Sequence, residues 1–454
     1  MSPQEKKGYY GWTIVFCSFI VIFLSFSIRG SFGVFMPQMQ KALGWSATAL
    51  SGGISIFMVV YGIFAMISGM ELDKFGPKPT FLIHGILLGL GLFLASYSTK
   101  PWHFYLTYGV ISGIGAGALF APPTQLVRKW FIKDLGKALG FTTAGCGLGF
   151  GLAPLLAMVM MGPLGWDWSF SMKVLGILLT VGVVIVAFFT KPTPESIGLH
   201  PPGYEEAQAA DKSGGTSAKA EYSFTLGESL KTSSWWLLAI AWFCSNLSEF
   251  CCLTHSLNYA KKDLVLNPNI QTYLYALSGF AYMIIGPITG GFIDRLTVKF
   301  AGDQLKARKR CTLIFYGLAA VACAIMLAGE FMPHGTLTEA GEVATAAPFA
   351  THAVYTLYSL IFGIASGSYI PSIVGISGVI YGRKYAGSVW GTLTLIGMGA
   401  GAGLGPIMAG ALYDIRGSYL IPIIVALVSY AAAALLTQTL HRHNPPADAV
   451  ARGA

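Results

Sequence analysis

The chain has 454 residues, of which 54% are hydrophobic and only 11% are charged, and its mean hydropathy is +0.62. Soluble domains carry about 25% charged residues, so this composition excludes a water-soluble globule and indicates a protein that folds in lipid. The net charge of +9 comes from residues scattered over many loops, which gives no support to a nucleic-acid partner.

Apolar segments of about 20 residues, the length that crosses the hydrocarbon core, recur along the whole chain. We predict twelve membrane helices, at 11–35, 48–72, 79–98, 102–127, 137–162, 169–190, 233–260, 270–295, 308–330, 348–378, 386–413 and 417–440. The first segment lacks a small-residue cleavage site, so we predict a retained helix rather than a signal peptide. The expected fold class is an all-α integral membrane protein.

A glycine pattern in the fifth predicted helix recurs in the eleventh. The shared positions are Gly145, Gly147, Gly149, Gly151, Leu152 and Pro154 in one helix and Gly397, Gly399, Gly401, Gly403, Leu404 and Pro406 in the other. This repeat predicts two pseudo-symmetric six-helix bundles, at 1–190 and 233–454, joined by a polar linker at 191–232. Such internal repeats are typical of secondary transporters.

Basic residues alternate between the two sides of the predicted helices. Of the 29 lysines and arginines, 22 fall in the tails and in alternate loops, five fall in the opposite loops, and Arg29 and Lys173 lie within helices. By the positive-inside rule, we predict that both termini are cytoplasmic and that the chain lies in the cell's inner or plasma membrane. The seven cysteines have no metal-ligand spacing, so we expect reduced packing residues, no metal and no cofactor.

A short motif follows the second predicted helix and recurs after the eighth. Gly69, Asp73 and Lys74 form the first copy, and Gly290, Asp294 and Arg295 form the second. This Gly-xxx-Asp-(Arg/Lys) turn resembles the signature of the major facilitator superfamily. The resemblance covers the whole chain and implies that the motif stabilises one transport conformation; a solvated turn without a gating role is the alternative.

Further motifs resemble those of the bacterial branch that contains monocarboxylate transporters and oxalate/formate exchangers. They are Arg128-Lys129-Trp130-Phe131 with Gly136, Lys137 and Gly140; Gly165-Trp166 with Ser169-Phe170; Pro194-Glu195 with Gly198-Leu199; and Tyr381-Gly-Arg383-Lys384 with Gly387 and Gly391. These loops and glycine helices are scaffold, so they indicate the family and not the substrate.

Ionisable residues inside a membrane helix mark a site or an ion path by default. In the first helix, Arg29 lies among Ser25, Ser27 and Ser31. A guanidinium stays charged and can fork onto a carboxylate through two hydrogen bonds. We predict that Arg29 binds the carboxylate of the substrate; a structural ion pair or a snorkelling residue is the alternative.

The seventh helix carries a polar stripe that contains Glu249, with Asn246 and His255 beside it. We predict that Glu249 couples a proton to transport and that Asn246 and His255 contact the substrate. For His255, a satisfied hydrogen bond between helices is the alternative. Hydroxyl donors are expected from Tyr282 and Tyr369, with Tyr61, Tyr108, Tyr355 and Tyr358 as further candidates.

One feature departs from the family. Monocarboxylate and oxalate carriers commonly have an arginine in helix 8, whereas the run from Tyr273 to Ile293 contains none. A dianion such as oxalate would be desolvated against a single strong cation, which is costly, so a monoanion is favoured.

The sequence therefore predicts a secondary carrier, not an enzyme. It would move a small monocarboxylate such as lactate or pyruvate, with a proton, by alternating access, and we expect a monomer. An anion exchanger of the oxalate/formate type and an exporter of another small molecule are the alternatives.

Overall fold

The structure is a computed structural model that describes residues 9–131, 134–201, 204, 222–339, 343–382 and 385–444. Within these residues, twelve helices are long and apolar enough to cross a membrane, as predicted. Residues 202–203 and 205–221 of the predicted linker, together with Arg383 and Lys384 of the second-half loop motif, lie outside the described residues.

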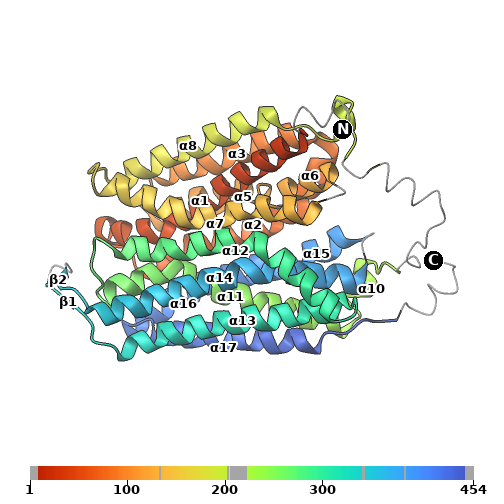
Figure 1. Cartoon of the computed structure of the whole chain (residues 1–454). Coiled ribbons are helices and arrows are strands. Elements are labelled where there is room, and N and C mark those ends of the chain that lie inside the picture. Colours follow the sequence, from red (N-terminus) through yellow and green to blue (C-terminus); the bar gives the residue numbers. More distant parts are fainter. Residues whose placement is uncertain are drawn as a thin grey trace.

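The N-terminal bundle is drawn in red to yellow in Figure 1. Its membrane helices are α1 (Gly11–Leu43), α2 (Ala47–Phe75), α3 (Pro77–Ala95), a segmented fourth helix, α7 (Leu135–Met161) and α8 (Trp168–Phe189). The fourth helix consists of α4 (Pro101–Phe104), the π-helical η1 (Tyr105–Ile111), α5 (Ser112–Gly117) and α6 (Ala121–Trp130).

The C-terminal bundle follows two short helices, η2 (Pro194–Ile197) and α10 (Leu226–Ser229). Its membrane helices are α11 (Ser233–Lys262), α12 (Gln271–Lys299), α13 (Gln304–Ala328) with η3 (Gly329–Phe331), α14 (Phe349–Tyr381), a segmented eleventh helix, and α17 (Leu420–Thr439). The eleventh consists of α15 (Ala386–Thr394), the π-helical η4 (Leu395–Gly401) and α16 (Ala402–Arg416).

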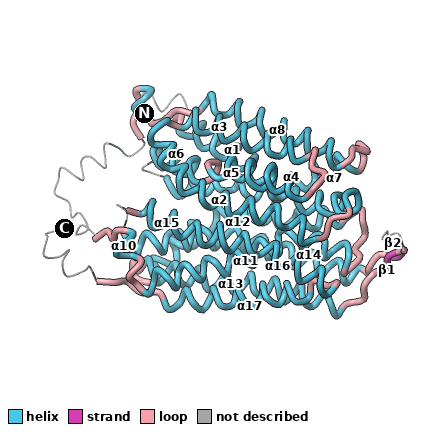
Figure 2. Tube along the Cα trace, turned by 180° about the vertical axis from the view of Figure 1, so that it is seen from behind, coloured by secondary structure: helices cyan, strands magenta, loops and turns pink. Residues whose placement is uncertain are grey.

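The two ends of the molecule are easily told apart. The described part of the chain begins before α1 and ends after α17 at one end of the molecule, and a small antiparallel hairpin of β1 (Thr336–Leu337) and β2 (Val343–Thr345) lies at the other (Figures 1 and 2). We call these the termini end and the hairpin end. Helix starts at both ends use local caps: the Ser46 hydroxyl accepts from the Ala49 amide at the start of α2, and the Asp303 carboxylate accepts from the Lys306 amide at the start of α13.

The repeated glycines explain how the bundles meet. In α7, Gly145 and Gly149 lie against the backbone of α1, whereas Gly147 and Gly151 lie against α12 of the other bundle. A spacing of four places residues on one face of a helix, so alternate glycines serve opposite faces. The second copy repeats this arrangement: Gly397, Gly401 and Gly405 approach α11, and Gly399 and Gly403 approach α2. Each glycine helix thus joins the first helix of its own bundle to the second helix of the other.

Candidate functional site

Arg29 lies near the middle of α1 and is 3% exposed. Its Nη2 donates to Ser25 Oγ at 3.2 Å, one turn earlier on the same helix. The guanidinium carbon lies 3.9 Å from the ring centre of Phe26 and 4.6 Å from that of Tyr61. Among the described residues, Nε and Nη1 have no hydrogen-bond partner. A buried cation with free donors is costly, and an anion would satisfy it.

Close packing of α1 on α7 sets the position of this guanidinium. Gly30 faces the backbone of Gly149 so closely that a side chain at position 30 would collide with it. Phe26 then packs edge-on against Phe150 of α7, with ring centres 5.4 Å apart. These contacts hold one side of the Arg29 environment in place, while α2 provides Tyr61 from another.

Glu249 lies near the middle of α11 and is 4% exposed. Its Oε2 accepts a hydrogen bond from the hydroxyl of Tyr369 on α14. The Tyr369 ring packs against Tyr316 of α13, with centres 4.7 Å apart, and against Trp242, two turns before Glu249, at 6.1 Å. Within the described residues, the carboxyl thus accepts a hydrogen bond from a tyrosine whose own ring packs against two further aromatic rings.

The two ionisable groups belong to one central cluster. Glu249 lies within electrostatic range of Arg29, and Tyr282 of α12 lies within range of both. Tyr282 packs against Phe150 with ring centres 6.2 Å apart. The fold thus brings together Arg29, Glu249, Tyr282 and Tyr369 from four helices and both bundles. We call these four residues the central cluster.

Asn246 lies one turn before Glu249 and is fully buried. Its Nδ2 donates to the Trp242 carbonyl at 2.8 Å, and its Oδ1 has no partner among the described residues. The free oxygen could accept from a hydroxyl group but not from a carboxylate.

His255 lies nearly two turns from Glu249, about 9 Å along the axis of α11. Its Nε2 lies 3.0 Å from the Pro406 carbonyl and 3.2 Å from Ser51 Oγ, and its Nδ1 lies 3.1 Å from the Tyr419 hydroxyl. Since a carbonyl can only accept, this network assigns the proton to Nε2. These contacts favour the alternative of a hydrogen bond between helices; a substrate contact stays a prediction.

The first copy of the loop motif makes an ion pair. Asp73 Oδ1 accepts from Lys129 Nζ of α6 at 2.7 Å, and Lys74 lies over the Phe75 ring. Gly69 faces the amide of Gln125, also on α6. In the second copy, Asp294 lies within electrostatic range of Arg308, whose Nη1 donates to the Pro371 carbonyl at 3.1 Å. Gly290 has open space beside it. The gating role of both copies stays a prediction.

The hairpin end carries polar contacts between the bundles that sequence reasoning missed. Asp414 of α16 accepts from the Ala47 amide at 3.2 Å and the Thr48 amide at 2.8 Å, so a carboxylate of one bundle caps a helix of the other. Lys262 Nζ donates to Gln40 Oε1 at 3.0 Å. Beside them, burial raises the pKa of Asp263 to about 6, and its Oδ2 accepts from the Tyr419 amide.

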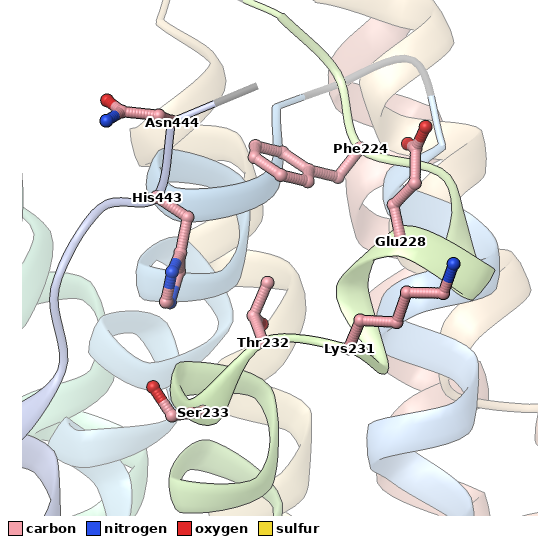
Figure 3. A pocket seen from close by; sticks show the side chains of 7 residues that line it. All are labelled: Phe224, Glu228, Lys231, Thr232, Ser233, His443 and Asn444. Atoms are coloured by element: carbon pink, nitrogen blue, oxygen red, sulfur yellow. The ribbon is translucent and has the colours of Figure 1, made fainter. Parts of the chain in front are cut away.

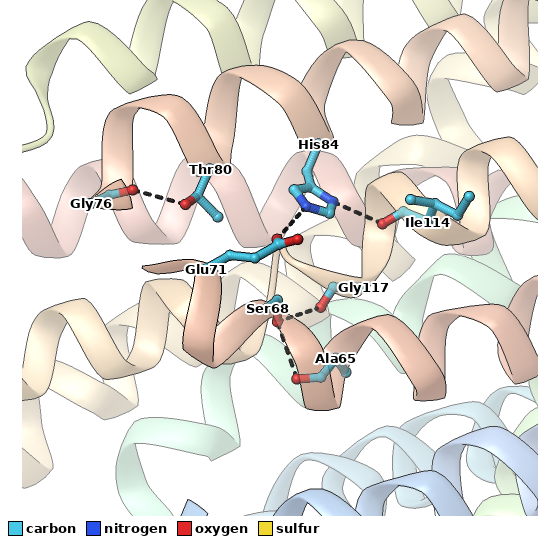
Figure 4. A network of polar contacts seen from close by, with 8 residues as sticks. All are labelled: Ala65, Ser68, Glu71, Gly76, Thr80, His84, Ile114 and Gly117. Atoms are coloured by element: carbon cyan, nitrogen blue, oxygen red, sulfur yellow. Dashed lines mark hydrogen bonds and ion pairs between the residues drawn. The ribbon is translucent and has the colours of Figure 1, made fainter. Parts of the chain in front are cut away.

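A second group that the sequence reasoning missed is a histidine–glutamate contact inside the N-terminal bundle. His84 of α3 lies 2.8 Å from Glu71 of α2 (Figure 4). A histidine in the middle of a membrane helix was the available signal, because such residues are rare without a role.

A surface pocket of about 540 Å³ lies at the termini end, where the segment before α11 meets the segment after α17 (Figure 3). It is lined by Phe224, Glu228, Lys231, Thr232, Ser233, His443 and Asn444. It contains no residue of the central cluster.

Comparisons with known proteins identify the family. The model of the Major Facilitator Superfamily matches residues 18–338, and the chain belongs to this family of membrane transporters. The chain is 25% identical to chicken (Gallus gallus) monocarboxylate transporter 4 over 95% of its own length and 83% of that protein. It is also 25% identical to a probable sulfoacetate transporter, SauU, of Cupriavidus necator, over 92% of this chain and 91% of that one.

Other matches are partial or structural. The chain is 32% identical to bovine (Bos taurus) monocarboxylate transporter 13, but the match spans only 35% of this chain and 37% of that protein. The crystal structure of a point mutant of the nucleoside transporter NupG matches with a TM-score of 0.64 at 13% identity, over 94% of this chain and 100% of that one. This likeness shows the fold, and the predicted fold class and family are confirmed.

Proposed function

We propose that this transporter carries a small organic monoanion, a monocarboxylate of the lactate or pyruvate kind, together with a proton. The observation that carries the proposal is the Arg29 guanidinium, which is buried near the middle of α1 with Nε and Nη1 unpartnered among the described residues. Nη2 carries two hydrogens and Ser25 takes only one, so either Nε or Nη1 can form, with the other Nη2 hydrogen, the fork that matches the two oxygens of a carboxylate.

The surroundings of Arg29 favour one negative charge rather than two. Phe26 and Tyr61 cover the guanidinium with rings, which keeps water away and strengthens its attraction for an anion. The central part of α12 has no arginine or lysine that could hold a second carboxylate. A bound dianion would therefore keep one charge poorly compensated.

Glu249 supports coupling to a proton. A substrate carboxylate at Arg29 would place a second negative charge near Glu249, and protonation of Glu249 would remove that repulsion. Tyr369 can donate to the ionised carboxyl, and its hydroxyl can also accept from the protonated one. Substrate and proton would then bind together.

The names of the relatives support an organic anion with a carboxylate. The monocarboxylate transporters favour a monoanion, whereas sulfoacetate has a sulfonate beside its carboxylate and carries two charges. Exchange of anions of the oxalate/formate type and export of another small molecule are the alternatives.

In the proposed cycle, the bundles at 1–190 and 233–454 move relative to each other as units around the central cluster. We further propose a monomer in the cell membrane with both termini in the cytoplasm.

The test is counterflow and binding with purified protein. Proteoliposomes would be assayed with labelled lactate, pyruvate, formate and oxalate, with and without a pH gradient. Binding of the best substrate would then be measured on folded Arg29→Gln and Arg29→Lys. We expect the dissociation constant to rise about 100-fold in Arg29→Gln, and less in Arg29→Lys, which keeps the charge but loses the fork.

Lys173→Gln is the matched control, because Lys173 is also a cation within a membrane helix but lies over the Tyr97 ring, 4.2 Å from its centre. It should bind the substrate as the natural chain does. An unchanged dissociation constant in correctly folded Arg29→Gln would end the proposal.

A further inference from the structure

Apart from the central cluster, the N-terminal bundle contains a buried contact between a histidine and a glutamate. The His84 imidazole of α3 contacts an acceptor at each of its nitrogens: Nδ1 lies 2.9 Å from the Ile114 carbonyl of α5, and Nε2 lies 2.8 Å from Glu71 Oε2 of α2 (Figure 4). One histidine thus ties together three segments of the bundle.

These distances determine how many protons the group holds. The Ile114 carbonyl can only accept, so Nδ1 must carry a hydrogen. With Nδ1 protonated, a neutral imidazole has a lone pair at Nε2, and an ionised Glu71 has lone pairs at Oε2. A contact of 2.8 Å between them needs one more proton, either on the imidazole or on the carboxyl. The observed geometry is therefore that of a group with a bound proton.

A proton can reach this group from one side. The His84 side chain is 5% exposed, whereas the Glu71 side chain is 31% exposed. Glu71 lies in the last turns of α2, between Gly69 and Asp73 of the loop motif, at the termini end of the bundle. A proton would thus enter by way of the carboxyl and be held against a dry imidazole.

The carbonyl that His84 holds belongs to a break in the fourth membrane helix. α5 ends at Gly117 and α6 begins at Ala121, where Pro122 and Pro123 cannot supply the amides that would continue the helix. Ile114 is among the last four residues of α5, whose carbonyls have no partner within their helix. His84 occupies one of these carbonyls, and Ser68 Oγ approaches that of Gly117 at 3.5 Å.

The other side of the break has its own link to α2. Lys129 of α6 pairs with Asp73, two residues beyond Glu71, at 2.7 Å. The end of α2 therefore holds α5 through the His84–Glu71 contact and α6 through Asp73. The His84–Glu71 contact needs a proton that is bound and released in the neutral range, whereas a lysine–aspartate pair ordinarily does not.

We propose that His84 and Glu71 form a proton-binding site that holds the joint between α5 and α6 in its present angle. With the proton bound, α2, α3 and α5 are connected. Without it, the neutral imidazole has one hydrogen for two acceptors, so either the Glu71 contact or the Ile114 contact opens, and the end of α5 is freed to move relative to α6. The site is separate from Glu249, which lies in the other bundle, so the chain has two places at which a proton acts.

Other charged groups near His84 are accounted for on the elements that pack against α3. Asp73 and Lys129 pair with each other, and Lys173 of α8 lies over Tyr97 at the far end of α3. α5 has no ionisable side chain, and η1 has only Tyr105 and Tyr108. The remaining charged residues are Lys78 of α3, Lys74 of α2 and Arg128 of α6, all at the termini end and exposed.

The test is hydrogen–deuterium exchange of residues 112–124, measured on the full chain in lipid nanodiscs from pH 5 to pH 9 and corrected for intrinsic rates. In the natural chain, we expect the protection of this segment to fall about tenfold as the pH rises, in a single titration. His84→Gln and Glu71→Gln should each give a protection that does not change with pH, because neither variant can hold the shared proton.

Three control variants distinguish this site from the other titratable groups of the chain. His103→Gln changes another histidine of the same bundle, Asp73→Asn weakens the link to α6, and Glu249→Gln removes the proposed coupling carboxyl. All three should keep the titration, although Asp73→Asn should lower the protection at every pH. A flat profile in the natural chain, or a titration that persists in Glu71→Gln, would overturn the proposal. Loss of the titration in Glu249→Gln would likewise overturn it and assign the proton to the central cluster.

Discussion

At the scale of single residues, the hydrogen-bond partners of a buried polar side chain distinguish roles that the sequence cannot tell apart. Arg29 and His255 are both intramembrane polar residues, and both are predicted from the sequence to contact the substrate. Both His255 nitrogens have protein partners on other segments, whereas two Arg29 nitrogens have none among the described residues. A buried donor without a partner gains a hydrogen bond when a ligand binds, whereas a donor that already has a partner gains none.

Glu249 gives a prediction at this scale. Glu249→Gln keeps the shape and can still bond to Tyr369 but cannot exchange a proton. We expect the variant to retain exchange of labelled for unlabelled substrate and to lose accumulation driven by a proton gradient. Both are measured by uptake in proteoliposomes.

The control for Glu249→Gln is Glu330→Gln, at the hairpin end of the same bundle, which should keep pH-driven accumulation. If Glu249→Gln still concentrates substrate on an inward proton gradient, the coupling residue lies elsewhere, and His255 is the next candidate.

At the scale of elements, the ends of helices add contacts between the bundles. α1 extends to Leu43, eight residues beyond its predicted end, although Pro37 lies within it. The buried Met36 and Met39 continue its packing, and Gln40 reaches Lys262 of the other bundle. The apolar pattern predicts too short a helix here, because the last turns of α1 pack on protein rather than on lipid.

The start of α2 gives a prediction at this scale. Asp414→Ala should remove the cap that α16 provides to α2 and favour opening of the hairpin end. Loss of a capping carboxylate costs about 1 kcal/mol, which shifts a two-state population about fivefold. We expect spin labels at positions 41 and 416 to show a larger share of long distances.

Asp167→Ala is the matched control for this change. Asp167 caps α8 within one bundle by accepting from the Phe170 amide at 2.6 Å. Both variants should lose thermal stability to a similar degree, but the label distances should change only for Asp414→Ala. Equal distance distributions in the two variants would contradict the role of Asp414 in closing the hairpin end.

At the scale of the whole molecule, the two bundles meet through α7 with α12 and through α2 with the eleventh helix. These contacts use close backbone approach at glycines. Some of the basic residues that we predict on the cytoplasmic side are described and lie at the termini end. Lys74, Lys78, Arg128 and Lys129 belong to the ends of α2, α3 and α6 on that side.

The orientation is the prediction at this scale. Tags at either terminus should be protected from protease added to intact cells and cleaved in inverted vesicles, because 22 basic residues lie in the tails and the loops of that side. A tag in the 332–347 loop, at the hairpin end, should show the opposite behaviour. Cleavage of either terminal tag from outside intact cells would reverse the topology.

The sequence by itself determined the features that depend on lipid as a solvent. A bilayer demands long apolar helices whose backbone is satisfied internally, so the twelve spans and the family could be predicted from apolar segments and short motifs. Segment bounds agreed with the structure to within a few residues, except at the end of α1 and at the breaks in the fourth and eleventh helices.

Only the tertiary structure decided which polar residues meet. The sequence proposed Arg29, Glu249, Tyr282 and Tyr369 one helix at a time, and packing of four helices placed them in one cluster. The sequence did not indicate that His84 faces Glu71, 13 residues away, or that Asp414 caps α2 at Thr48, 366 residues away. Such pairs depend on how the helices are rotated and how closely they approach. Periodicity fixes the face of a helix but not the neighbour that the face meets, and a polar side chain in a membrane acquires its role from that neighbour.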